Sequence, residues 1–219
     1  MTPGHPDHPQ DHGDGNPGGD RNGGPPHDHD HHDHHDDHDG PAGHHELSVQ
    51  ERLYPTLTCF GCGHANPKGL KLRSYEAPGH GARSPATAVT GLFMPWPEHD
   101  NGVGFLNGGI IATLLDCHSA AAVVLEAKRQ GWEALGGALL PFVTAGIDVR
   151  YLRPSPLTEP VELWAAVTRS TESEMTVDVE LRFEEKTRAT ATATWRRWRP
   201  RPAGGSGTAP PLGGHTPGA

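Results

Sequence analysis

Residues 108–128 read GGIIATLLDCHSAAAVVLEAK, a long stretch that is rich in Ala and Leu and contains no Pro. Its length and composition favour a helix over a strand. Asn107 stands directly before it as a suitable N-cap, and Gly131 follows it as a suitable stop signal. Apolar residues lie on nearly all sides of this helix, so we expect it to be buried inside its domain.

Strand-like segments flank the helix in the sequence. Two precede it and four follow it, at residues 70–76, 86–94, 142–153, 161–169, 174–184 and 187–198. The segment 174–184 alternates most clearly, with Val177, Val179 and Leu181 on one face and polar residues on the other. Short connections between successive strands favour antiparallel pairing. We therefore predict an α+β domain in which a curved antiparallel sheet wraps one long central helix.

Both ends of the chain differ in composition from this domain. Residues 1–45 hold 12 of the 17 His and ten Asp against one Arg, so they account for the whole formal net charge of −9. A basic nucleic-acid-binding surface is thereby excluded as a global property. Residues 200–219 are rich in Gly and Pro. We expect disordered tails at 1–46 and 200–219 around a domain at 47–199.

Cysteine usage and hydropathy bear on where the protein is located in the cell. Three Cys are too few for a disulfide scaffold, and the first residues have neither a charged n-region nor an apolar h-region. The longest uncharged apolar run, 101–115, is shorter than the roughly 18 to 20 residues that a membrane span needs. The sequence therefore predicts a soluble, cytoplasmic protein with no membrane contact.

Three segments carry a family resemblance. Residues 101–116, NGVGFLNGGIIATLLD, resemble the active-site segment of hotdog-fold acyl-CoA thioesterases of the phenylacetate-degradation (PaaI) type, which usually reads N-x5-H-G-G-x4-L-x-D. The residues at matching spacing are Asn101, Gly108, Gly109, Leu114 and Asp116. CFGCGHANPKGLKL at 59–72 and VTAGIDVRYLRPSPL at 143–157 are also similar to that family, so the resemblance covers about 59–198. The departure is Asn107, which stands where the family usually has His.

The Gly pair and Asp116 are the first candidate site residues. Two Gly at a helix start let a ligand approach backbone N–H groups at the positive end of the helix dipole. The resemblance implies that the Gly109 amide, together with Gly108, forms an oxyanion site and that Asp116 is the general base or nucleophile. Two alternatives remain: the Gly pair is a turn, or Asp116 belongs to a polar stripe with Thr113 and Ala120.

The resemblance also suggests positioning residues. Asn101 matches the amide that orients the water or the thioester, although its neighbours Asp100 and Gly102 equally indicate a turn. Thr144 matches a position that often carries a water-positioning Ser or Thr, and an ordinary strand Thr is the alternative. Asn107 keeps a polar contact and can cap the helix but cannot shuttle a proton.

Several further residues could contact substrate. Arg150 and Arg153 lie where a strand ends before Pro154 and could meet the phosphates of coenzyme A, although surface Arg is common on strands. His118 is expected at the pocket wall or in the core. Cys117 and His118 are neighbours on the helix and point about 100° apart, so they do not form a Cys–His nucleophile pair. Cys117 is therefore expected to pack in the interior.

Metal ligation has two candidates. Cys59, Cys62 and His64 form C-x2-C-x-H, half of a zinc site. With no second pair in the domain, we interpret it as loop packing and expect no metal there. The tail imidazoles could bind divalent Zn, Ni or Cu loosely, or the tail could be a solvated spacer; the His residues concerned are His29, His31, His32, His34 and His35.

The resemblance implies a function. It predicts hydrolysis of acyl-CoA to free acid and coenzyme A, with no cofactor required beyond the coenzyme A of the substrate, by a homodimer or a dimer of dimers. The family takes Asp from one subunit and the Gly pair from the other. Because Asn107 replaces His, a non-catalytic module that binds acyl-CoA is an alternative, and metal buffering by the tail is another.

Overall fold

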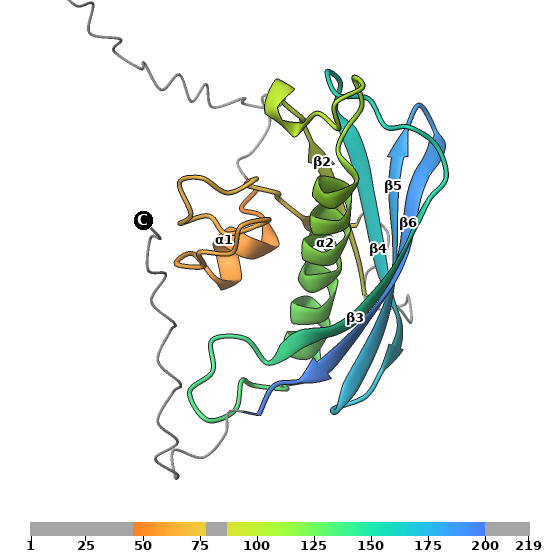
Figure 1. Cartoon of the computed structure of the whole chain (residues 1–219). Helices are drawn as coiled ribbons and strands as arrows, with labels where there is room; N and C mark the ends of the chain where they lie inside the picture. The colour runs from red at the N-terminus through yellow and green to blue at the C-terminus, as the bar shows by residue number, and fades with distance from the viewer. Residues whose placement is uncertain (1–45, 78–86, 200–219) are drawn as a thin grey trace, which may run out of the picture. The chain divides into compact units, whose positions relative to one another are not determined.

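The computed structural model describes residues 46–77 and 87–199. The tails predicted at 1–46 and 200–219 lie outside the described residues, apart from Glu46. Within the described ranges, one long helix and one curved antiparallel sheet make up most of the fold, and the sheet wraps this helix (Figure 1). The predicted hotdog fold is confirmed.

The central helix α2 spans Gly108–Arg129. Asn107 caps its start as predicted, and Gln130 caps its end before Gly131, whose φ of 71° ends the helical path. Buried residues occur on all sides of α2, which confirms the expectation of a core helix. By length and hydropathy α2 is the one helix in 46–77 and 87–199 that could cross a membrane, but core helices pass the same test, and 56% of its most apolar window is buried.

Six strands form the sheet in the order β1-β2-β4-β5-β6-β3, and every neighbouring pair is antiparallel. They are β1 Tyr75–Glu76, β2 Ala88–Phe93, β3 Phe142–Tyr151, β4 Val161–Ser170, β5 Glu174–Phe183 and β6 Lys186–Arg197. The strand predicted at 70–76 is reduced to β1. The first residues of the predicted strand bind a neighbouring loop instead. The N–H groups of Leu70 and Leu72 donate to the carbonyls of Phe60 and Gly61 in that loop.

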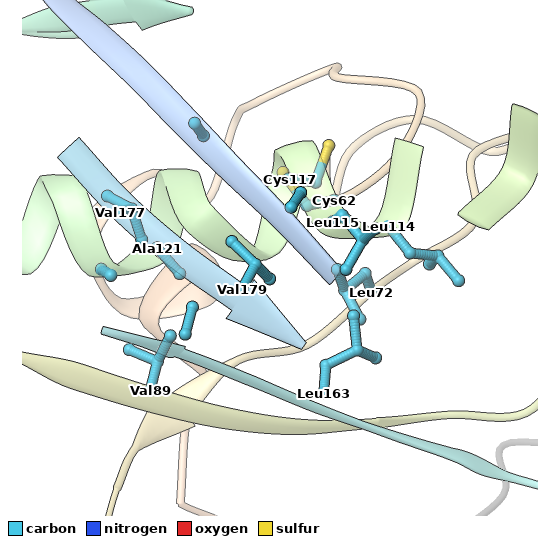
Figure 2. Close-up of a cluster of buried hydrophobic side chains, with 14 of the residues drawn as sticks. Cys62, Leu72, Val89, Leu114, Leu115, Cys117, Ala121, Leu163, Val177 and Val179 are labelled. Atoms are coloured by element: carbon cyan, nitrogen blue, oxygen red, sulfur yellow. The ribbon is translucent and has the colours of Figure 1, made fainter. Parts of the chain in front are cut away.

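The inner face of the sheet packs against α2. Val177, Val179 and Leu181 of β5 are buried, as their alternation predicts, and alternate residues of β6 present small Ala side chains to the core. Figure 2 shows these strands meeting Leu114 and Leu115 of α2. The core therefore lies between the helix and the concave face of the sheet.

A short helix on the other side of α2 was not predicted. Helix α1, Val49–Leu53, lies on the side of α2 away from the sheet (Figure 1). Ser48 and Glu51 form a capping box at its start, a signal that was present in the sequence. The N–H of Val49 donates to the Ser74 carbonyl at 2.8 Å, which ties α1 to the segment before β1. A 3-10 turn, η1 at Pro97–His99, precedes the loop that leads into α2.

Candidate functional site

A largely apolar cavity of about 360 Å³ lies between α1, the loop after it, α2 and the start of β3. Tyr54, Val124, Phe142 and Trp195 supply part of its wall. The polar groups that reach it include Asp116 and Thr144, with three Cys described below. A mostly apolar cavity with a few convergent polar groups is the usual form of a small-molecule site.

Asp116 and Thr144 meet at this cavity. The Thr144 hydroxyl donates to Asp116 Oδ1 at 2.9 Å and so joins α2 to β3 across 28 residues of sequence. The register of β3 shifts against β6 between Thr144 and Gly146, and a bulge of this kind re-aims side chains. Burial raises the pKa of Asp116, the Thr144 hydrogen bond lowers it in part, and negative charge on Cys59 raises it further. The structure thus brings the two candidates Asp116 and Thr144 into direct contact, in a setting that favours a base.

The N-terminus of α2 differs from the expectation of free N–H groups. Asn107 Oδ1 accepts from the Gly109 N–H at 2.7 Å and from the Ile110 N–H at 3.4 Å. The cap predicted for Asn107 is therefore present, and it occupies the amide expected to serve as the oxyanion donor. The Tyr151 hydroxyl donates to the Gly108 carbonyl at 2.8 Å, which brings the end of β3 to the same place.

Asn101 lies in the loop before α2 and organises that loop. Its Oδ1 accepts from the N–H groups of Val103 at 3.0 Å and Phe105 at 3.2 Å. Gly102 and Gly104 have φ values of 89° and 86°, which the turn requires. In this chain Asn101 makes the turn contacts that its neighbours indicated, and its Oδ1 is directed at the backbone.

The two Arg lie near the end of β3. Arg150 is exposed, and its guanidinium is 3.8 Å from Asp148 Oδ2. Arg153 Nη1 donates to the Thr187 carbonyl at 2.9 Å, which fixes it to the start of β6. Since Tyr151 contacts Gly108, this part of β3 lies at the N-terminal end of α2, away from Thr144. Arg150 thus lies exposed at that end, whereas Arg153 has a structural contact.

His118 faces the core and takes the second of the two roles considered for it. It is fully buried, with Nδ1 2.9 Å from Ser74 Oγ and Nε2 3.3 Å from the Val89 carbonyl. Burial lowers its pKa to about 4, so the ring is neutral. His118 does not line the cavity, and the expectation that it binds substrate is corrected on this ground.

Three Cys form a cluster that the sequence did not predict. The Sγ atoms of Cys59, Cys62 and Cys117 all lie within 4.8 Å of one another, and all three residues line the cavity. The pattern C-x2-C at 59–62 was visible, but Cys117 is 55 residues or more away and carries no local signal. His64, the other member of that pattern, is instead 3.6 Å from Glu51 Oε1.

Comparison with known proteins identifies part of the chain. The sequence pattern of the thioesterase superfamily matches residues 103–190, which include Gly109, Asp116 and Thr144. The match leaves out Asn101 and the segment 59–72. No curated protein matches the chain.

Several solved structures are similar to it. A phenylacetic acid degradation-related protein from Ralstonia eutropha JMP134 shares 24% identity, with 50% of this chain and 75% of that one covered at a TM-score of 0.42. The PaaI protein of the E. coli phenylacetic acid degradation operon shares 20% identity over 52% and 73%, at 0.42. A Streptococcus mutans UA159 protein solved with acetyl CoA shares 22% over 52% and 81%, at 0.42. Residues 103–190 of this hotdog domain thus match the thioesterase superfamily, in agreement with the resemblance in its sequence.

Proposed function

We propose that this protein hydrolyses acyl-CoA thioesters and that Asp116 carries the reaction. The observation that supports this most is the Asp116–Thr144 pair at the wall of an apolar cavity, inside the segment that matches the thioesterase superfamily. An apolar acyl group fits the cavity, and its thioester then lies at the Asp116 end. The cytoplasmic location stays a prediction, as does loose metal binding by the tail imidazoles.

Thioester hydrolysis assigns each group a task. As a base, the Asp116 carboxylate takes a proton from water while the water oxygen attacks the thioester carbon. As a nucleophile, the carboxylate attacks that carbon itself, and water then hydrolyses the resulting anhydride. In both cases the C–S bond breaks and coenzyme A leaves as a thiolate that is then protonated. Thr144 fixes the carboxylate. The oxyanion requires a backbone N–H donor, and the Gly109 N–H can take this role only when Asn107 Oδ1 releases it. No cofactor enters this reaction.

A homodimer would complete this site. Gly109 and Asp116 are seven residues apart on one helix, about 10 Å along its axis, so one carbonyl group cannot contact both in the same chain. A second chain can supply the missing half. Strand β3 is a ten-residue edge strand with exposed backbone groups, and Tyr151 is an exposed apolar residue on it. We infer that β3 and the neighbouring loop form the dimer contact. Arg150 then lies near the Gly109 end as a contact for coenzyme A phosphates, while Arg153 shapes the strand end.

Substitution of Asp116 tests the function. Asp116→Asn removes the base but keeps the side-chain volume, and we expect turnover of a panel of short, long and aromatic acyl-CoAs to fall by about 10² to 10⁴-fold. Asp178→Asn is the matched control, because Asp178 also accepts a 2.9 Å hydrogen bond from a Thr but lies exposed on the outer face of the sheet. Full activity of Asp116→Asn would refute the assignment.

A second candidate function is a module that binds acyl-CoA without hydrolysing it. The observation that favours it is the Asn107 cap, which occupies the Gly109 N–H at 2.7 Å. Asn107→Gly would free this amide at a cost of only a few tenths of a kcal/mol, because Gly is a tolerable N-cap. Asn107→His would restore the residue that the resembled family carries.

The two functions predict different kinetics for these variants. If the chain is a binding module, the wild type binds acyl-CoA without turnover, and Asn107→Gly or Asn107→His gains hydrolysis. If it is a thioesterase, the wild type already hydrolyses, and Asn107→Gly changes the rate by the gain of one oxyanion donor, up to about 10²-fold. Release of free thiol from acyl-CoA measures both.

A further inference from the structure

We propose that Cys59, Cys62 and Cys117 form a binding site for one thiophilic cation, with Zn²⁺ as the first candidate. The proposal goes beyond the hydrolytic function and does not depend on it. It rests on the three Sγ atoms that converge at the wall of the cavity, where the loop 57–63 meets α2. Figure 2 shows two of these residues, Cys62 and Cys117.

The sulfur positions fit a zinc ion. With Zn–S distances of about 2.3 Å, tetrahedral geometry places two ligand sulfurs about 3.8 Å apart. Cys59 Sγ and Cys117 Sγ are 3.6 Å apart, and all three sulfurs lie within 4.8 Å of one another. Small side-chain rotations therefore suffice to bring the third thiolate to the same cation.

The loop is built to hold this arrangement. The Gly63 N–H donates to the Cys59 carbonyl at 2.9 Å, which closes a turn over residues 59–63. A Cβ at Gly61 would lie 2.3 Å from Cys117 Sγ, and a Cβ at Gly63 would lie 2.4 Å from the Cys59 nitrogen. Glycine at 61 thus lets the loop approach α2, and glycine at 63 lets the turn of the loop close on Cys59.

Metal binding would change the protonation of the cluster. Zn²⁺ binds cysteine as the thiolate, so a bound ion would displace the protons of the thiols at this site.

The remaining coordination position would face the cavity. Among the described residues, the cluster contains three Cys and no His, because His64 pairs with Glu51. Three protein ligands with one open position are typical of zinc sites that bind water or a ligand. Soft sulfur ligands also favour Zn²⁺ over hard cations such as Mg²⁺. A bound ion would join the loop to α2 one residue from Asp116 and fix that wall of the cavity.

Cobalt substitution tests this site in the full chain. Co²⁺ bound to thiolates gives a sulfur-to-cobalt charge-transfer absorption, which the His-rich tail cannot produce because imidazoles bind through nitrogen. We expect this absorption to saturate at one Co²⁺ per chain and to disappear on addition of Zn²⁺. We also expect Zn²⁺ to protect all three thiols from an aromatic disulfide reagent until a chelator is added.

Variants separate the proposed site from its surroundings. Cys59→Ser, at a half-buried position, and Cys117→Ala should each abolish the absorption while circular dichroism stays unchanged. His64→Ala is the matched control and should leave it intact. Three results would overturn the proposal: no thiolate absorption in the wild type, its retention in both Cys variants, or its loss in His64→Ala.

Discussion

Two Asp–Thr pairs in this domain have the same hydrogen bond and different surroundings. Thr144 donates to Asp116 at 2.9 Å, and Thr192 donates to Asp178 at 2.9 Å. The first pair joins α2 to β3 at the cavity, whereas the second is a direct cross-strand pair between β5 and β6 on the outer face of the sheet. The hydrogen bond alone therefore does not make a candidate site.

The difference lies in solvent and in the neighbouring groups. Asp116 is half-buried beside apolar walls and a thiol cluster, so its charged form is disfavoured and its pKa is raised. Asp178 is exposed, and water solvates its charge. A carboxylate is a better base where burial raises its pKa. Asp116 at the cavity is in such a setting, whereas Asp178 lies on the outer face of the sheet.

The largest expected effect is on the free energy of unfolding and compares the inner and outer faces of the sheet. Leu163 of β4 is 1% exposed in the core (Figure 2), and its neighbour Glu162 points to the outside. Leu163→Ala should lower the free energy of unfolding by about 2 to 5 kcal/mol, because it removes buried methyl groups and leaves a cavity. Glu162→Ala should change it by less than about 0.5 kcal/mol. Urea unfolding monitored by Trp fluorescence measures both, and similar losses would contradict the division of the faces.

The next effect is on kcat/KM and compares the hydroxyl groups of Thr144 and Thr192. Thr144→Val should reduce the kcat/KM of acyl-CoA hydrolysis by about tenfold, because a hydrogen bond to a charged group contributes about 1.5 to 3 kcal/mol and some of that loss is recovered by water. Thr192→Val removes the corresponding bond from Asp178 and should leave kcat/KM unchanged. If both variants behave alike, Thr144 does not position Asp116. Thr144→Ser, which keeps the hydroxyl, should restore most of the rate.

Much of this arrangement could be predicted from the sequence, because it depends on local patterns. The long Ala/Leu-rich run with Asn107 before it predicted α2 to within one residue at its end, and alternation predicted both faces of β5. The strand predicted at 70–76 forms only at Tyr75–Glu76, because Leu70 and Leu72 bind the loop of Phe60 and Gly61. The alternation of apolar and polar residues in a sequence does not show to which carbonyl a backbone N–H will donate.

The candidate site could be predicted only where a resemblance supplied the distant partner. Thr144 and Asp116 are 28 residues apart, and no local pattern joins them. For Cys117 no such guide existed, so Cys59 and Cys62 were interpreted as loop packing. The cap at Asn107 was predicted, but its consequence was not: Asn107 Oδ1 binds the Gly109 amide that was expected to be the oxyanion donor.

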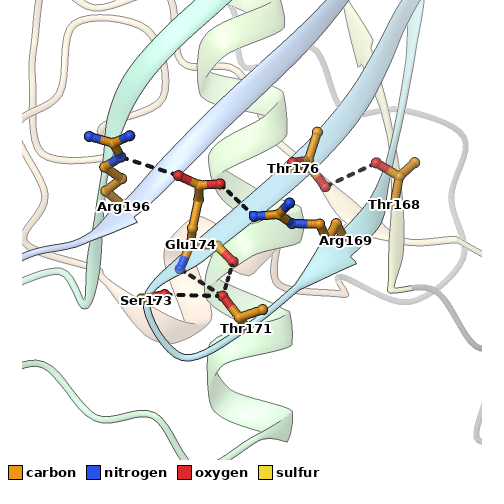
Figure 3. Close-up of polar contacts among 7 residues, drawn as sticks. All are labelled: Thr168, Arg169, Thr171, Ser173, Glu174, Thr176 and Arg196. Atoms are coloured by element: carbon orange, nitrogen blue, oxygen red, sulfur yellow. Dashed lines mark hydrogen bonds and ion pairs between the residues drawn. The ribbon is translucent and has the colours of Figure 1, made fainter.

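The smallest expected effect concerns charges on the outer face. Glu174 begins β5 and accepts from Arg169 at 2.7 Å and from Arg196 at 3.2 Å, and both Arg side chains are largely exposed (Figure 3). Exposed ion pairs are screened by water and salt, so Glu174→Gln should cost less than about 1 kcal/mol.

The turn beside Glu174 explains why this loss stays small. Thr171 Oγ1 accepts from the Glu174 N–H at 3.0 Å and donates to the Glu174 carbonyl at 2.8 Å, and neither bond involves the carboxylate (Figure 3). The hairpin therefore keeps its shape when the charge is removed. Urea unfolding of Glu174→Gln and wild type at low and high salt should show a difference that shrinks as salt is added. A difference that persists at high salt would mean that the carboxylate holds the hairpin by geometry rather than by charge, and the contrast between the two faces would then be weaker than the two Asp–Thr pairs indicate.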